Sequence, residues 1–308
     1  MKDQDDSLPV AEKKLVASST TQSAVISTEI SDQNSSNADT KVAGSSSQKQ
    51  LLSLAKHFVL DGALLPENKQ MPLEERVVKR ERFARLRQQQ NLEAIIQKSL
   101  HYCPRGANSA KADQDWFNRF THLAEDVSNK TMQDLWAKIL AGEITQPGSF
   151  SLKSLNVFKL MSITDAKLLA KVCGLVVKDN SRKNLRLLSG SYKTPSLWSF
   201  MSKTTQSSIN LNQCGISYSE ILSLADNKLI FSEETESRAL QKGEQMVFNF
   251  NGRTLTLTAN VNQCGLRFYK FTPIGSELAL LISDKPNKEL VPLLSSSLHA
   301  HFSVNADE

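Results

Sequence analysis

The clearest pattern in the chain is a stripe of apolar residues at helical spacing near its centre. Between Met132 and Leu140, apolar side chains recur at i, i+3, i+4, i+7 and i+8, which is the spacing of one buried helix face. Gly142 and the pair Pro147-Gly148 favour the end of that helix. Similar patterns predict further helices over 51–65, 73–102, 113–127, 152–158 and 164–176. We therefore expect a compact domain of four or five helices over residues 50–177.

The predicted helix over 73–102 changes character along its length. Its second half places Leu92, Ile95 and Ile96 on one face, which is a packing surface. Its first half, over 74–90, is crowded with Arg and Gln and has little apolar stripe.

Polar residues mark the expected starts of the next helices. Asp113 or Asp115 can accept the unpaired backbone N–H groups of one helix start and complement its dipole. Ser128 and Thr164 are the N-caps expected for two later helices.

The pattern changes in the C-terminal third of the chain. Ser217 and Glu220 form a capping-box pair at the head of a helix. Alternating residues on both sides of Asn251-Gly252 predict a β-hairpin, and Leu266 to Phe271 predict another strand. Thr272-Pro273 then opens a helix, since proline is tolerated at the first helical position. This order predicts a small α+β module over 216–283 that is reminiscent of a winged helix.

Three segments show no regular pattern. Residues 1–49 contain no Phe, Tyr, Trp or Arg, so we expect a disordered tail that buries too little apolar area to offset its ordering entropy. Residues 178–215 are expected to form a basic linker or irregular segment, and 284–308 a loose C-terminal tail. The expected fold class is therefore mainly α, with a helical domain followed by the small module.

The net charge of +5 hides an asymmetry along the chain. Residues 1–49 carry five Lys against seven acids, a net charge of −2, which leaves +7 for the rest. The basic residues concentrate over 74–105 and 178–203. Such a surface favours weak association with nucleic acid or anionic lipid without establishing either.

The sequence also bears on the cellular compartment. The start, Met-Lys-Asp-Gln-Asp-Asp, lacks the basic and apolar regions of a secretory signal. The longest apolar stretch, near Leu168 to Val177, is too short to span a bilayer. The four cysteines, at positions 103, 173, 214 and 264, form no C-x-x-C pair, so we expect reduced thiols in the cytoplasm and no metal site.

Several segments carry a resemblance to a known family: Arg87–Ile96, Asp115–Phe117, Arg119-Phe120, Ala124–Ser128, Leu135–Glu143, Pro147–Ser151 and Thr272–Leu278. In their order they resemble an uncharacterised proteobacterial family, domain of unknown function 2806, over about residues 50–283. The Trp-Ala-Lys-Ile-Leu-Ala-Gly-Glu run is its most specific part. A similar Leu-Trp-Ala-Lys-Leu-Leu-Ala pattern occurs locally in the alpha proteins of abortive-infection phage defence. The family resemblance implies kinship and brings no reaction with it.

Acidic and aromatic residues near the central helices have competing interpretations. Glu125, Asp126 and Glu143, with His122, are candidates for acid–base chemistry if they point inward. The alternative is that Asp126 and Ser128 cap a helix junction and Glu143 is a surface end. Trp116 and Trp136 could stack on a base or sugar, but their helical spacing among apolar residues favours the core.

Basic residues supply the candidate binding sites. On the first half of the long helix they are Arg76, Lys79, Arg80, Arg82, Arg85 and Arg87. They form either a solvated face with i,i+4 ion pairs or a helix that contacts phosphates or docks a partner. In the irregular segment they are Arg182, Lys183, Arg186 and Lys193, with Trp198 as a candidate for base stacking.

The sequence contains no P-loop, G-x-G-x-x-G, H-E-x-x-H or G-x-S-x-G motif, so we predict no catalytic residue, metal or cofactor. Our first hypothesis is a bacterial, non-catalytic interaction module that binds protein or nucleic acid through its basic surface. The alternatives are a phage-defence or stress effector and an enzyme of an unrecognised class. The sequence does not predict the partner or the oligomeric state.

Overall fold

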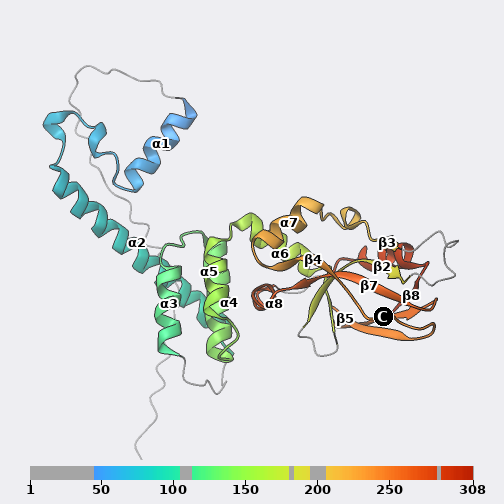
Figure 1. Cartoon of the computed structure of the whole chain (residues 1–308). Coiled ribbons are helices and arrows are strands. Elements are labelled where there is room, and N and C mark those ends of the chain that lie inside the picture. The colour runs from blue at the N-terminus through green and yellow to red at the C-terminus, as the bar shows by residue number, and fades with distance from the viewer. Residues whose placement is uncertain (1–44, 105–112, 180–183, 195–205, 283–285, 308) are drawn as a thin grey trace, which may run out of the picture. The chain divides into compact units, whose positions relative to one another are not determined.

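The computed structural model describes residues 45–104, 113–179, 184–194, 206–282 and 286–307 (Figure 1). The chain divides into two compact units, residues 1–51 and 52–308. Helix α1 (Ser46–His57) spans that boundary. Short 3-10 helices, η1 (Gly62–Leu64) and η2 (Glu67–Lys69), follow it, so the single helix expected over 51–65 is interrupted. Val59 has a positive φ of 58°, a left-handed turn that ends the helical path.

The remaining helices of the N-terminal half agree closely with the apolar pattern. They are α2 (Leu73–Tyr102), α3 (Gln114–Ala124), α4 (Lys130–Thr145), α5 (Leu152–Leu160) and α6 (Ile163–Cys173). Asp113 caps α3 as one of the two alternatives predicted. Ser128 and Thr164 do not cap their helices. Asn129 caps α4 by accepting from Thr131 N and Met132 N, and Ser162 caps α6 through a capping box with Asp165.

The helices share a core built around Trp136, which is fully buried. Its ring lies 5.3 Å from that of Phe120 and 5.2 Å from that of Phe158, and Trp116 stacks on Phe120 at 5.3 Å. Aromatic pairs at these spacings add to the free energy gained from burying the rings. The preference for a core position over a stacking site at Trp116 and Trp136 is confirmed.

A polar network fixes α2 where the helix enters this core. The Gln133 side-chain amide donates to Asn91 Oδ1 at 3.2 Å and to Val127 O at 2.9 Å. Asn91 Nδ2 in turn donates to Glu125 O at 2.8 Å. Gln133 is buried, and these bonds satisfy a group that would otherwise oppose burial.

The second half of the chain forms one antiparallel sheet in the order β4-β7-β2-β1-β5-β6-β8, with β3 pairing β2. Its eight strands in the described part of the chain are β1 (Val177–Lys178), β2 (Leu185–Lys193), β3 (Gln206–Ser208), β4 (Ile230–Glu236), β5 (Gln245–Phe250), β6 (Arg253–Ala259), β7 (Cys264–Phe271) and β8 (Phe302–Ala306). Four short helices accompany it: η4 (Leu211–Cys214), α7 (Tyr218–Asp226), α8 (Pro273–Ala279) and α9 (Leu290–Leu298).

This architecture differs from the expected mainly α fold with a small module, because it is mixed α/β. The sheet takes Lys178 of β1 and all of β2 and β3 from the segment expected to be irregular, and β8 from the tail expected to be loose. The hairpin around Asn251-Gly252 is present, but β5 also pairs β1 and β6 also pairs β8. It is therefore not a free wing, and the winged-helix likeness ends with the local order of elements.

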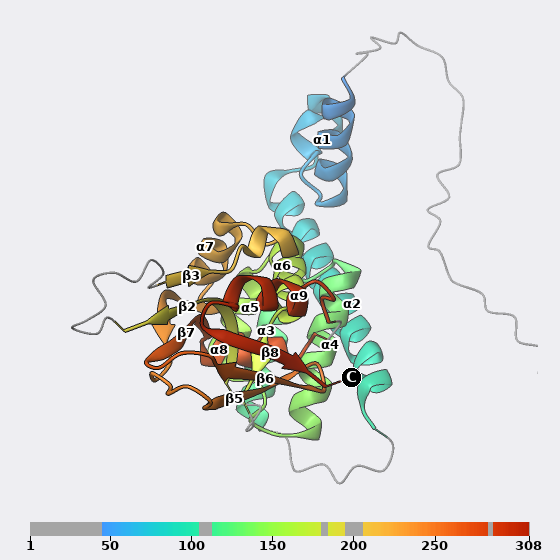
Figure 2. The same cartoon turned by 90° about the vertical axis from the view of Figure 1, so that its right-hand side faces the viewer.

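The C-terminal segment is fixed by burial. Leu290, Leu294, Leu298 and Phe302 are all almost fully buried, which is why 286–307 is ordered despite its polar composition. Helix α9 contacts β8, β3 and β2 (Figure 2). Ser191 Oγ of β2 lies 2.8 Å from His301 Nδ1, just before β8. Because β2 and β8 are not neighbours in the sheet, this contact requires the sheet to curve.

Helix α8 depends on a residue without a side chain. Thr272 Oγ1 donates to Lys228 O at 2.6 Å and accepts from Gly275 N at 3.0 Å, so it caps α8 and holds it to the end of α7. A Cβ at Gly275 would collide with the Leu229 carbonyl group. Only glycine fits at this crossing.

We expect Gly275→Ala to lower the free energy of unfolding by about 1–3 kcal/mol, the usual cost of overpacking. Urea denaturation measures the change. Leu280→Ala, at a neighbouring side chain that is 67% exposed, is the control and should change stability by less than about 0.5 kcal/mol. Equal stability of the two variants would contradict the collision.

Candidate functional site

The first candidate group is the set of acids, and Glu143 proves to be a structural anchor. Its carboxylate accepts from Gly148 N at 2.7 Å and from Phe150 N at 2.9 Å. Trp116 Nε1 donates to Phe150 O at 2.8 Å. Glu143 is buried, so it is neither a surface end nor a free acid. Glu143 and Trp116 thus hold the loop over 146–150 in place.

Glu277 is a second carboxylate anchor, and it joins α8 to the start of α5. Its Oε2 accepts from Ser151 N at 2.7 Å and from Ser154 Oγ at 2.6 Å. Ser151 is also the N-cap of α5. A carboxylate at a helix N-terminus is favoured by the unpaired N–H groups and by the helix dipole.

The other predicted acids do not form a buried pair. Asp126 is exposed and its Oδ1 accepts from Gln88 Nε2 at 3.1 Å. Glu125 is half-buried at the C-terminus of α3, and His122 is exposed. An acid–base site is expected in a cleft that shields its groups from water, so this arrangement does not favour catalysis at these residues.

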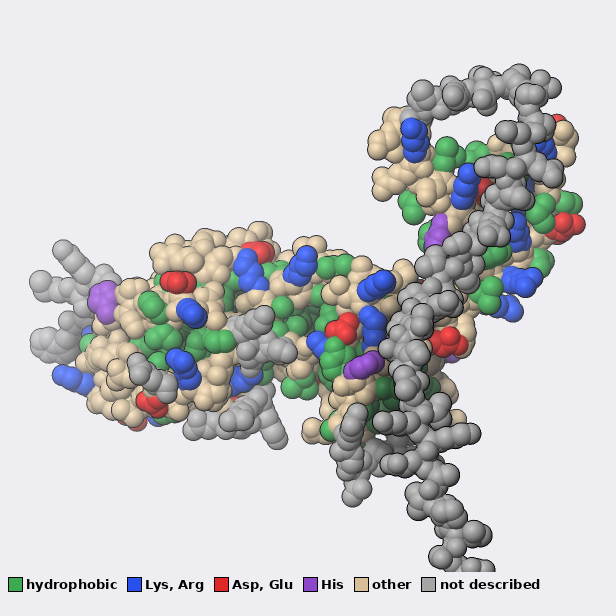
Figure 3. Space-filling model, turned by 180° about the vertical axis from the view of Figure 1, so that it is seen from behind, with side chains coloured by type: hydrophobic (Ala, Val, Ile, Leu, Met, Phe, Trp, Pro, Cys, Tyr) green, Lys and Arg blue, Asp and Glu red, His purple; other side chains and the backbone are tan. Residues whose placement is uncertain are grey.

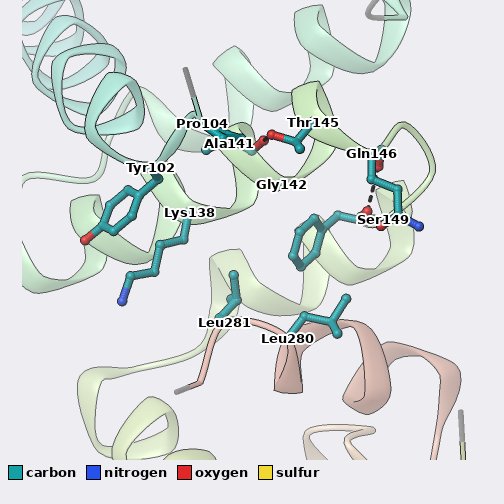
Figure 4. Close-up of a pocket in the computed structure, with 11 residues that line it drawn as sticks. Tyr102, Pro104, Lys138, Ala141, Gly142, Thr145, Gln146, Ser149, Leu280 and Leu281 are labelled. Carbon is teal, nitrogen blue, oxygen red and sulfur yellow. Dashed lines mark hydrogen bonds between the residues drawn. The ribbon is translucent and has the colours of Figure 1, made fainter. Parts of the chain in front are cut away.

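A cavity of about 580 Å³ lies beside the loop over 146–150 (Figure 4). Lys138 and Gly142 of α4, Tyr102 of α2, Phe150 and Leu281 contribute to its walls. Tyr102 donates its hydroxyl to Asp134 Oδ1 at 2.6 Å, and Lys138 Nζ lies 3.5 Å from Asp134 Oδ2. In Figure 4 the side chains of Tyr102 and Lys138 extend to the same side of α4.

The hydrogen bond to Asp134 raises the pKa of Tyr102 from 10.0 to about 12, with smaller contributions from burial and from the negative charge of Asp134. The carboxylate stabilises the protonated hydroxyl that donates to it and opposes a second negative charge. Tyr102 therefore stays a hydrogen-bond donor well into the alkaline range.

The predicted basic residues of α2 separate into two sets. Successive helix positions are turned by about 100° around the helix axis. Arg80 and Arg87, which follow Arg76 by four and eleven residues, therefore share one side of the helix with it. Arg82 and Arg85 lie on another side. The Arg87 guanidinium lies 4.7 Å from the centre of the Phe58 ring. Arg76 is part-buried beside Gly62, where a Cβ would meet its Cδ at 2.5 Å. One side thus contacts residues 58–62, and Arg82 and Arg85 are exposed.

Among the candidate binding residues predicted after 178, the structure describes Arg186. Arg186 is on β2, where its guanidinium lies 4.9 Å from the ring of Phe268 and 5.7 Å from that of Phe248. Such cation–π contacts give Arg186 a packing role on the sheet. Arg182, Lys183 and Trp198 lie outside the described residues.

A cleft that the sequence did not indicate lies over the sheet. Ser189 of β2, Arg267 and Tyr269 of β7, and Glu234 of β4 line it together with η4 and α7. Arg267 and Tyr269 alternate in a strand, a pattern that suggests an exposed face, and Ser189 lies in a segment expected to be irregular. The only sequence signal was an arginine between the apolar residues Leu266 and Phe268.

The described ranges contain no helix that combines the length and hydropathy needed to cross a membrane. Within the same ranges, no three His, Cys, Asp or Glu side chains gather as metal ligands do.

We expect Glu143→Gln and Glu277→Gln each to destabilise the fold by about 1–3 kcal/mol. At Glu143 an amide cannot accept at both of the oxygen positions that are used. At Glu277 an amide oxygen can replace Oε2, but it lacks the negative charge that strengthens both bonds. The measurement is chemical denaturation. Glu93→Gln is the control, since exposed Glu93 has its bond to Gln89 in water and should lose less than about 0.5 kcal/mol. An effect at Glu93 as large as at Glu143 would refute the anchoring role.

Tyrosinate absorbance during an alkaline titration should resolve a tyrosine that ionises near pH 12. Asp134→Asn should return the pKa of that tyrosine toward 10.0. Because the pKa of Tyr102 is raised by folding, its contribution to stability is complete below its unfolded pKa and is lost as the pH rises toward 12. Tyr102→Phe should remove the late step and leave the other tyrosines unchanged. If the late step survives in Tyr102→Phe, it belongs to another tyrosine and the prediction is wrong.

Comparison with known proteins adds kinship. No curated protein and no solved structure matches the chain, so the local likeness to abortive-infection alpha proteins stays a prediction. The model of a family described as Protein of unknown function (DUF2806) matches residues 75–295, from the first turn of α2 into α9. That range includes the two carboxylate anchors and strands β1 to β7 of the sheet. The chain therefore belongs to the DUF2806 family.

Proposed function

We propose that this protein is a non-catalytic interaction module that binds another protein through residues 52–94, here named the arm. The observation that carries the proposal is burial: no residue of the arm is buried, and Ile95 is the first buried residue of α2. Twelve of the twenty-two large hydrophobic side chains that are exposed in the described residues lie in the arm. Apolar surface concentrated in this way is typical of a protein interface.

Hydrophobic and basic side chains are interleaved along the arm (Figure 3, upper right). Val78 is 66% exposed, Leu86 50% and Phe83 44%, and they alternate along α2 with Lys79, Arg82 and Arg85. A nucleic-acid backbone would neutralise the charges but leave these apolar groups in water. A protein surface can cover both kinds of side chain, so it fits the arm better than nucleic acid does.

Charge also identifies the chemistry of the partner. Residues 74–90 carry six Arg or Lys against three Glu, a net charge of +3. A second copy of the same helix would bring two such charges together, whereas an acidic surface with apolar anchors would be attracted. We therefore propose an acidic, amphipathic partner and not self-association.

Site-specific photo-cross-linking of the full-length chain tests this proposal. A photoreactive residue at Phe83 should yield one defined adduct with an acidic protein, which is then purified with its partner. The same residue at Leu160, which is 83% exposed outside the arm, is the matched control and should not yield this adduct.

The purified partner should bind the wild-type chain more weakly as salt increases. Val78→Asp combined with Leu86→Asp should weaken binding by at least about tenfold while leaving the melting temperature unchanged, because both side chains are exposed. Leu160→Asp should leave binding unchanged. A nuclease-sensitive adduct, an adduct of the chain with itself, or equal cross-linking from Leu160 would overturn the proposal.

The compartment we propose for this binding is the cytoplasm. Its support is chemical: all four cysteines are thiols without a disulfide, and three of them are buried. This usage suits a reducing compartment.

A further inference from the structure

The cleft over the sheet has a volume of about 270 Å³ and is distinct from the arm. Residues of strands β2, β4 and β7 line it together with η4, α7 and Ser208 of β3. Both β2 and β4 lose regular register beside it, between Leu188 and Gly190 and between Ile230 and Glu234. Bulges of this kind re-aim side chains and are frequent next to functional sites.

Arg267 is held in the cleft wall with one donor unused. Its side chain is 17% exposed, and Nη1 lies 3.2 Å from Glu234 Oε2. Nη2 donates to Ser207 O at 3.3 Å and to Ser208 Oγ at 3.1 Å. The buried Nε has no partner among the described residues. The guanidinium is thus oriented by its other bonds, and its buried Nε–H group is left without an acceptor among the described residues.

The backbone around Arg267 is shaped for that placement. Gly190, opposite Arg267 in the β2–β7 ladder, has no room for a Cβ, which would meet Arg267 Nη2 at 2.9 Å and also the Ser207 carbonyl oxygen. A side chain at this position would displace the guanidinium. Glycine therefore allows the arginine to lie against β3.

Ser189 supplies a second unused group in the same cleft. It lies at the irregularity of β2 and is 7% exposed, and its Oγ has no partner among the described residues. Buried hydroxyl and guanidinium donors without an acceptor are uncommon, and each calls for an explanation. Two of them on the wall of one cavity suggest a missing acceptor.

The other residues that line the cleft indicate which kind of molecule carries that acceptor. Glu234 balances the charge of Arg267, so the cleft has no net charge to attract an anion. Tyr218 and Tyr269 offer aromatic rings, and Ile216 and Ile221 apolar contacts. Burial and the nearby Glu234 raise the pKa of Tyr269, which keeps its hydroxyl protonated. The volume is near the lower end of the range for ligand pockets, about 300 Å³, and suits one ring system.

We propose that this cleft binds a small, neutral, planar heterocycle that carries a carbonyl oxygen, a molecule of nucleobase size. The carbonyl accepts from Arg267 Nε–H and Ser189 Oγ–H, and the ring lies among the tyrosine and isoleucine side chains. The proposal does not depend on the arm, because the two sites share no residue.

Ligand-observed NMR and calorimetry on the full-length protein test the site with defined probes. Uracil, uridine and nicotinamide are the neutral planar probes, and acetate and inorganic phosphate are the anionic ones. Binding of uracil or nicotinamide with exclusion of both anions is expected. Uridine distinguishes a free base from a base attached to a sugar.

Ser189→Ala and Arg267→Lys should each weaken binding of the neutral probe by about tenfold, the effect of losing one hydrogen bond to a positioned acceptor. Arg238→Lys is the matched control, because that arginine pairs with Glu244 and does not line the cleft. Glu234→Gln should give the protein an affinity for acetate that the wild type lacks, since Arg267 then keeps its full charge.

Melting temperatures of all variants separate loss of folding from loss of binding. If Arg267→Lys does not fold, Ser189→Ala and Glu234→Gln still decide the outcome, because they change one oxygen or one charge. Binding of acetate or phosphate to the wild type in preference to the neutral probes would overturn the proposal. So would binding unaffected by Ser189→Ala, or no binding of any neutral probe at millimolar concentration.

Discussion

The Glu277 carboxylate at the start of α5 ties the helices to the half of the chain that forms the sheet. It comes from α8, which follows β7 directly, and it accepts from the backbone and hydroxyl groups of Ser151 and Ser154. Glu143 fixes the loop just before Ser151 in the same way. The two carboxylates therefore order consecutive turns of the chain. Because Glu277 follows strand β7, its bonds make that order dependent on the sheet. Charge-assisted bonds of this kind are strong enough to define a junction.

The helical half was predictable because its signals are local. The stripe from Met132 to Leu140 needs only the periodicity of one segment, and the observed α4 carries it. The caps were displaced by one or two residues, since Ser128 and Asn129 are chemically equivalent as N-caps and only the backbone path selects between them. The hairpin around Asn251-Gly252 was predictable for the same local reason.

The sheet as a whole was not predictable, because its central strand has no local signal. Strand β2 contains Ser189, Gly190 and Ser191, which suggest a loop, yet all three are buried. Their partners in β7 follow about 75 residues later, so the pattern that pairs them is not visible in either segment alone. Arg267 was missed with them. The basic residues, by contrast, were visible in the sequence, but composition could not show that Arg186 packs on aromatic rings while Arg82 and Arg85 face solvent.

The burial pattern of α2 shows why binding at the arm can be separated from folding. One continuous helix has no buried residue in its first five turns and is fixed in its second half by Ile95, Ser99 and the Asn91–Gln133 network. Substitutions before Asn91 therefore change a surface, while substitutions at Ile95, Ser99 or the Asn91–Gln133 network change the core. The cleft has the opposite character, because Ser189 and Arg267 belong to the interior of the sheet and their unused donors exist only when the sheet is formed. A ligand in the cleft and an arm partner would both stabilise the folded chain by mass action, but the arm partner would do so by adding an interface to a fold that is already complete.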